Sequence, residues 1–61
     1  MKIREVLKLL KKDGWFIVRQ KGSHRQLKHQ TKTGLITIAG RESDDLKKGT
    51  LGNILRTAGL K

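Results

Sequence analysis

The segment WFIVRQKGSHRQLK, residues 15–28, predicts a β-hairpin. Its first part, residues 15–20, begins with aromatic and β-branched side chains, a composition typical of a half-buried strand. Gly22 follows, and glycine supplies the positive φ that tight hairpin turns favour. A second strand is predicted over about residues 23–29, so this segment sets the antiparallel pairing around which the remaining elements are arranged.

Side-chain alternation predicts which residues of the second strand face solvent. Leu27 is its only strongly apolar residue, so a period of two puts Leu27 and Arg25 on the buried face. The opposite face then carries His24, Gln26 and Lys28. His24 is therefore expected to be exposed.

The first strand does not reveal its inward face. Alternation puts Trp15, Ile17 and Arg19 on one face and the even-numbered residues on the other, and both faces begin apolar and end polar. Trp15 and Phe16 are the only aromatic residues of the protein. We expect both in the core, which leaves no aromatic platform for single-stranded nucleic acid.

An amphipathic helix is predicted ahead of the hairpin, over residues 2–13. Its apolar stripe has the i, i+3, i+4, i+7 spacing and consists of Ile3, Val6, Leu7 and Leu10. Gly14 can adopt the left-handed conformation that ends a helix. The hairpin therefore follows this helix directly.

A third strand and a second helix are predicted after the hairpin. Residues 30–34 form a polar turn, residues 35–39 a mostly apolar strand, and residues 40–48 a charged connection. Gly49 or Thr50 is expected to cap the second helix, and Gly59 to close it; its apolar stripe consists of Leu51, Ile54, Leu55 and Ala58.

The order helix, three strands, helix predicts an α+β fold. Two amphipathic helices can bury their stripes on one face of an antiparallel meander, which gives a two-layer sandwich. Sixty-one residues leave room for one small domain, residues 1–61, of marginal stability.

The formal net charge of +10 indicates an anionic partner. Nucleic acid is the usual partner of such small basic domains, with a membrane surface or an acidic protein as the alternatives. The segment 14–41 contains no Asp or Glu, whereas Glu42, Asp44 and Asp45 follow immediately. This acid-free central segment favours nucleic acid.

Cysteine is absent, which suits a reducing compartment and predicts a cytoplasmic protein. The longest apolar run is the four residues 15–18, too short for a signal peptide or a membrane span. We therefore expect no membrane association.

His24 is the candidate catalytic residue. Imidazole can both accept and donate a proton near neutral pH, and the flanking cations Lys21, Arg25 and Lys28 can hold a phosphate and its developing negative charge. The reaction that this suits is RNA cleavage, in which a base removes the 2′-hydroxyl proton and the oxygen attacks the adjacent phosphorus. A single histidine with cationic neighbours requires no metal or other cofactor.

His29 is a poor partner for His24. Five positions along a strand put the two rings on opposite faces and roughly 17 Å apart. We expect His29 in a turn. The carboxylates Glu42, Asp44 and Asp45 are the only candidate metal ligands, and a polar loop near a helix start explains them better. No metal site is predicted.

Further RNA contacts are expected around the hairpin and at the start of the second helix. Backbone N–H groups at a helix N-terminus bind phosphate, and lysines there reinforce the site. The predicted RNA-binding set is Arg19, Lys21, Ser23, Arg25, Lys28, Lys47 and Lys48.

Nearly the whole chain resembles the HicA-type mRNA interferase toxins of toxin–antitoxin pairs. The resemblance rests on the opening amphipathic helix ending in Gly14-Trp15, on the run 19–24 (RQKGSH), and on Lys48-Gly49-Thr50-Leu51 followed by Ile54-Leu55 and Ala58-Gly59-Leu60. It implies an α-β-β-β-α fold like that of double-stranded-RNA-binding domains. It also implies endoribonuclease activity on mRNA centred on His24, and a neutralising partner similar to the HicB antitoxin.

Two other interpretations fit the same composition. A non-catalytic RNA-binding module needs only the basic surface, and an adaptor for an acidic protein needs no nucleic acid at all. Cleavage of RNA in the presence of a chelator distinguishes a metal-independent endoribonuclease from both of these alternatives, and a binding module would instead bind RNA with steep salt dependence and leave it uncut.

Overall fold

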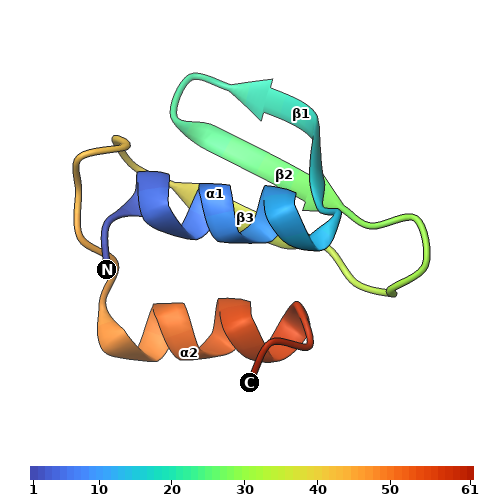
Figure 1. Ribbon diagram of the computed structural model, residues 1–61. Coiled ribbons are helices and arrows are strands. Elements are labelled where there is room, and N and C mark those ends of the chain that lie inside the picture. The colour runs from blue at the N-terminus through green and yellow to red at the C-terminus, as the bar shows by residue number, and fades with distance from the viewer.

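The computed structural model describes residues 1–61, and its elements follow the predicted order (Figure 1). They are α1 (Ile3–Asp13), β1 (Phe16–Lys21), β2 (His24–Lys28), β3 (Ile36–Ala39) and α2 (Lys48–Thr57). The strands form one antiparallel sheet in the order β1-β2-β3. The predicted α+β fold is thus confirmed.

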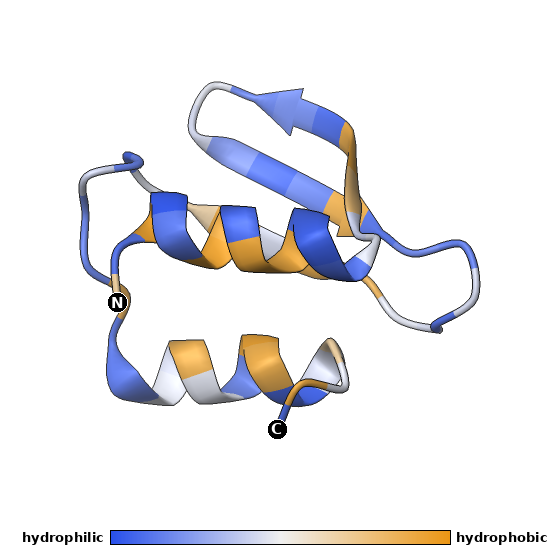
Figure 2. Ribbon diagram, in the orientation of Figure 1, coloured by the Kyte–Doolittle hydropathy of each residue, from blue (hydrophilic) through white to orange (hydrophobic).

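Both helices lie on the same face of the sheet and enclose the core with it. Apolar residues of α1 and α2 face each other and the sheet, whereas the hairpin end of β1 and β2 is hydrophilic (Figure 2). The core consists of Ile3, Val6, Leu7, Leu10, Trp15, Leu27, Ile36, Ile38, Ile54 and Ala58. Neither helix has the length and hydrophobicity needed to span a membrane.

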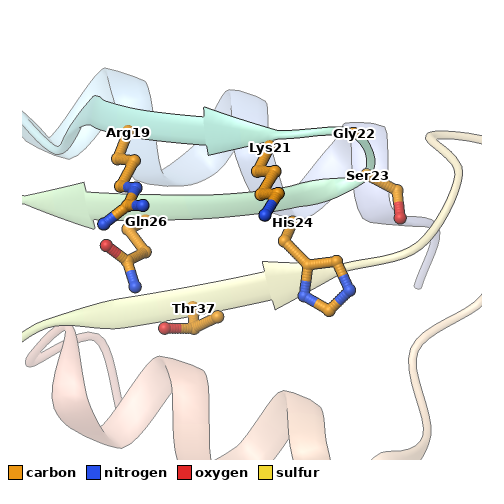
Figure 3. A pocket seen from close by; sticks show the side chains of 7 residues that line it. All are labelled: Arg19, Lys21, Gly22, Ser23, His24, Gln26 and Thr37. Carbon is orange, nitrogen blue, oxygen red and sulfur yellow. The ribbon is translucent and has the colours of Figure 1, made fainter.

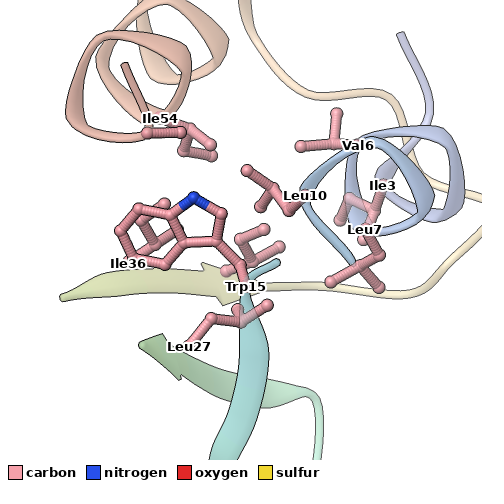
Figure 4. Packing of buried hydrophobic residues seen from close by; sticks show 10 residues of the cluster. Ile3, Val6, Leu7, Leu10, Trp15, Leu27, Ile36 and Ile54 are labelled. Carbon is pink, nitrogen blue, oxygen red and sulfur yellow. The ribbon is translucent and has the colours of Figure 1, made fainter. Parts of the chain in front are cut away.

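The two aromatic residues differ in placement, although both were expected in the core. Trp15 is 1% exposed and its indole ring lies among Leu10, Ile36 and Ile54 (Figure 4). Phe16 is 44% exposed, so the prediction for Phe16 was wrong. The register explains this, because Phe16 pairs with Lys28 on the sheet face that carries no helix.

The acidic segment after β3, residues 42–45, forms backbone hydrogen bonds with the first turn of α1. The N–H of Ile3 donates to the Asp44 carbonyl at 2.9 Å, and that of Arg4 to the Glu42 carbonyl at 3.0 Å. These bonds satisfy donors that a helix leaves free in its first turn, and negative side chains are favoured at that end.

α2 begins earlier than expected. Its N-cap is Lys47, and the N–H of Leu51 donates to the Lys47 carbonyl at 2.9 Å. Gly49 and Thr50 therefore lie inside the first turn, and neither caps the helix. No side chain makes a capping bond at Lys47, so the usual capping residue types gave a misleading signal here.

The turn after β2 joins the two helices through His29 and Lys32. His29 Nδ1 accepts bonds from the backbone N–H groups of Thr31 and Lys32, both at 3.1 Å. The hydrogen of the neutral ring is therefore on Nε2, which donates to the Asp13 carbonyl at 2.8 Å. His29 is a turn residue, as predicted.

Lys32 forms the second link at this turn. Its ammonium lies 2.6 Å from Asp13 Oδ2 and 2.9 Å from the Ala58 carbonyl, so one cation bridges the C-terminal ends of α1 and α2. The hydrogen bond from the Lys32 ammonium to Asp13 is the main cause of a lowered pKa at the Asp13 carboxyl. The bridge holds α1, the turn and α2 together.

Candidate active site

The candidate site is the face of the sheet opposite the helices, here called the outer face. Directly opposed residues of paired strands share a face, and the registers put Lys21, His24 and Ala39 in one row of side chains across the sheet. Arg19, Gln26 and Thr37 form the next row. Opposed Cβ atoms in such rows lie about 5 Å apart.

A β-bulge in β1 gives the outer face two of its cations. Ile17 pairs with Leu27, but Arg19 pairs with Gln26, so Val18 is an extra residue in β1. Strict alternation would put Ile17 and Arg19 on the same face, as the sequence predicts. Instead Ile17 faces the core and Arg19 faces outward, because the bulge shifts the alternation by one residue.

The two rows of side chains surround an open hollow of about 750 Å³. In Figure 3 the side chains of all three strands and of the hairpin turn border this space, with the imidazole of His24 above the end of β3. The lining residues are Arg19, Lys21, Gly22, Ser23, His24, Gln26 and Thr37. Its lining is thus polar and cationic, without a carboxylate.

His24 is exposed, as expected, and its imidazole makes no hydrogen bond to another residue. It is the first residue of β2 and follows a two-residue turn, Gly22-Ser23, in which Gly22 has φ +59°. This is the pattern of a type II′ hairpin turn, which suits the twist of the flanking strands. Both ring nitrogens are therefore available to a ligand in the hollow.

Arg25 lies on the inner face and is not brought into the hollow. It is 8% exposed, and its Nη1 donates to the carbonyls of Ser23 at 3.2 Å and Gly40 at 3.0 Å. Ser23 precedes His24, and Gly40 follows Ala39, the residue paired with His24. The buried guanidinium thus fixes the backbone on both sides of the catalytic candidate.

The other predicted RNA-binding residues are distributed over three places. Arg19, Lys21 and Ser23 line the hollow. Lys28 is exposed on the outer face, one row beyond the hollow and opposite Phe16. Lys47 and Lys48 are exposed at the start of α2 and do not line it.

Sequence reasoning missed Gln26 and Thr37 as members of the site. Gln26 was already expected on the same face as His24, and Thr37 is its partner in β3. Matching the two buried residues Leu27 and Ile36 across the strands would have aligned Gln26 with Thr37. The bulge at Val18 left no comparable signal in the composition of β1.

Neither histidine takes part in a group of potential metal ligands. His29 uses both ring nitrogens in the turn after β2. No three His, Cys, Asp or Glu side chains lie close enough together to hold a metal ion.

The comparison with protein families gives a match that covers almost the whole chain. A family described as "HicA toxin of bacterial toxin-antitoxin" matches residues 3–60, which include both helices and all three strands. No curated protein matches the sequence.

Proposed function

This chain belongs to the HicA toxin family of bacterial toxin–antitoxin systems, and we propose that it is an endoribonuclease that cleaves mRNA with His24 as its single proton-transfer residue. One observation supports this assignment above all. His24 is exposed, its imidazole makes no hydrogen bond within the protein, and it lies beside Lys21 and Arg19 in an open hollow. Such a site matches a phosphodiester in both charge and accessibility.

The proposed reaction is an attack of a ribose 2′-oxygen on the adjacent phosphorus. His24 removes the 2′-hydroxyl proton, the bond from O2′ to phosphorus forms, and the bond from phosphorus to O5′ breaks. The departing O5′ takes up a proton from water, so the products are a 2′,3′-cyclic phosphate and a 5′-hydroxyl. The chemistry needs no metal, because the protein supplies both the base and the positive charge.

The neighbouring cations stabilise the charge that develops on the phosphoryl oxygens. Lys21 is directly opposite His24, and Arg19 is one row further along the same strand. A guanidinium can hold two phosphate oxygens at once, whereas an ammonium acts as a compact charge. Ser23, Gln26 and Thr37 add hydrogen-bonding groups for sugar and base.

The remaining cations have more distant roles. Lys28 extends the positive charge along the outer face, and Lys47 and Lys48 provide a separate phosphate contact at α2. Arg25 is assigned as a positioning residue rather than an RNA contact, because its guanidinium is buried and already bonded to two carbonyls.

As a toxin of this family, the protein has an antitoxin partner. We propose that this partner is similar to HicB and that it neutralises the toxin by covering the hollow around His24. Carboxylates on the antitoxin would complement Arg19 and Lys21. Since the substrate is mRNA, the proposed place of action is the cytoplasm.

The test compares the wild-type protein with His24→Ala on a labelled RNA in the presence of a chelator. Loss of a general acid–base catalyst lowers rates about 10²- to 10⁴-fold, so the variant should leave the RNA intact over times in which the wild type cuts it. The variant should keep its fold, since His24 is exposed. It should also fail to inhibit growth when expressed.

Two results would contradict the proposal. A His24→Ala protein that cuts RNA at the wild-type rate would remove His24 from the chemistry. A wild-type protein that binds RNA with steep salt dependence but leaves it uncut would make this chain a binding module.

A further inference from the structure

Phe16 is an exposed aromatic residue on the same face of the sheet as His24. It is 44% exposed, and its ring stacks on no other aromatic side chain of the protein. Single exposed apolar residues are common on protein surfaces and by themselves indicate nothing. The position of Phe16 relative to the catalytic candidate makes this one informative.

The strand register puts Phe16 in line with the hollow. Phe16 pairs with Lys28, Arg19 with Gln26, and Lys21 with His24, so these three pairs share the outer face. His24 and Lys28 are four residues apart on β2, or about 13 Å. A polyanion that runs along the hairpin from His24 therefore passes Arg19 and Gln26 before it reaches Phe16.

The charges around Phe16 select the kind of partner. Lys28 is directly across from it, Arg19 and Lys21 follow on its own strand, and the strands carry no Asp or Glu. A purely apolar protein surface would leave these cations without partners. A nucleic acid offers both an aromatic base for the ring and phosphates for the cations.

We propose that Phe16 stacks on an unpaired base of the RNA, several nucleotides along from the bond that is cut at His24. The inference rests on the proposed function, because it takes RNA as the ligand of the outer face. Stacking on a side chain requires a base that is free of its duplex partner, so the ligand is single-stranded RNA. Phe16 then sets where the strand lies relative to His24.

The experiment measures binding of short single-stranded RNAs that carry one 2-aminopurine at successive positions. His24→Ala serves as the background so that the RNA stays intact. Stacking on Phe16 should quench the fluorescence at one position. Adding Phe16→Leu, which keeps an apolar side chain but removes the aromatic face, should abolish that quenching and weaken binding about tenfold, which corresponds to ~1.4 kcal/mol.

Two variants serve as controls. Phe16→Trp should retain the quenching, because indole offers a larger stacking surface. Leu9→Ala removes an exposed apolar side chain from α1, which lies on the opposite side of the sheet, and should change neither quenching nor affinity. Circular dichroism of each variant checks that the fold is unchanged.

Activity of the wild type and quenching in the Phe16 variants test the nuclease proposal and this inference separately. If adding Phe16→Leu to the His24→Ala protein changes neither quenching nor RNA affinity while the wild type still cuts RNA, the stacking inference is wrong and the nuclease proposal stands. The same conclusion holds if Phe16→Leu weakens only antitoxin binding. If quenching depends on Phe16 but the wild type cuts no RNA, stacking stands alone. Equal affinity for a duplex of the same sequence, or no RNA binding at all, would overturn the inference.

Discussion

At the scale of single residues, the cations of the hairpin have two distinct tasks. Lys21 is exposed on the outer face, whereas Arg25, four residues later, is buried and holds the carbonyls of Ser23 and Gly40. Burying a guanidinium without acceptors costs free energy, and so does burying carbonyl groups that have lost their donor. A cationic residue near this turn can therefore be available to a ligand or stabilise the backbone, depending on the face of the sheet on which it lies.

Arg25→Ala should mainly lower stability, whereas Lys21→Ala should mainly weaken RNA binding. Arg25→Ala should lower the free energy of unfolding by about 2 kcal/mol, because two hydrogen bonds from a charged donor are lost. Lys21→Ala should change it by less than about 0.5 kcal/mol, as is usual for exposed positions, but weaken RNA binding. Urea denaturation and RNA titration of both proteins measure these effects. An Arg25→Ala protein of unchanged stability but reduced affinity would contradict the positioning role.

At the scale of elements, the junction between α1 and β1 depends on a close approach of two segments. Gly14 has φ +106°, and a Cβ at this position would lie 2.7 Å from His29 Nε2. The ring of His29 in turn lies edge-on to Trp15, with 5.3 Å between ring centroids. Any side chain at position 14 would therefore displace the histidine that orders the turn after β2.

Gly14→Ala and Gly49→Ala should change stability in opposite directions. Gly14→Ala should lower the free energy of unfolding by about 2 kcal/mol or more, because it adds left-handed strain and a clash. Gly49 lies in α2 without positive φ, and a Cβ there meets nothing within 4 Å, so Gly49→Ala should raise stability by about 0.5 kcal/mol. Thermal denaturation tests both. A Gly14→Ala protein as stable as the wild type would show that the close approach is unimportant.

Element types could be predicted from the sequence, whereas the placement of β1 could not. The apolar stripe of α1 predicts which face of that helix is buried, and Leu27, the only strongly apolar residue of β2, predicts which face of that strand is buried. Both predictions were confirmed. β1 begins apolar on both faces, and the extra residue Val18 shifts the alternation at the point where the candidate site begins. A bulge is decided by pairing with the neighbouring strand, which the local sequence does not encode.

At the scale of the whole molecule, one ion pair joins elements that are distant in sequence. Lys32 contacts Asp13 at the end of α1 and the Ala58 carbonyl near the end of α2. Its hydrogen bond lowers the pKa of the Asp13 carboxyl below the ordinary value of 3.8. Folding therefore favours the ionised carboxylate, and this stabilisation is present above pH 3.8 and is lost as the pH falls through the lowered pKa.

Asp13→Asn should therefore remove part of the acid sensitivity of the fold. The variant should be less stable than the wild type at neutral pH, and the difference should shrink as the pH falls below 3.8. Glu42→Gln, which removes a carboxylate outside the ion pairs, is the matched control. Urea denaturation across pH provides the measurement. A constant difference between Asp13→Asn and the wild type down to the lowest pH would contradict the assignment.

The two faces of the sheet differ in composition. The helices and the inner face supply the core, while the outer face carries His24, its cationic neighbours and Phe16 without any carboxylate. This separation leaves the site open to a long polyanion and equally open to a protein that covers it. The proposed function therefore depends on what His24 does to RNA on that open face.

The most direct test of the proposed reaction compares an unmodified RNA with one that carries a single 2′-deoxy substitution at the cut site, with chelator present, and analyses the product ends. We expect the wild type to leave a 2′,3′-cyclic phosphate and a 5′-hydroxyl on the unmodified RNA. We also expect that the wild type does not cut at the 2′-deoxy position and that His24→Ala cuts neither RNA. Cleavage at the 2′-deoxy position, or unchanged cleavage by His24→Ala, would contradict the proposed reaction.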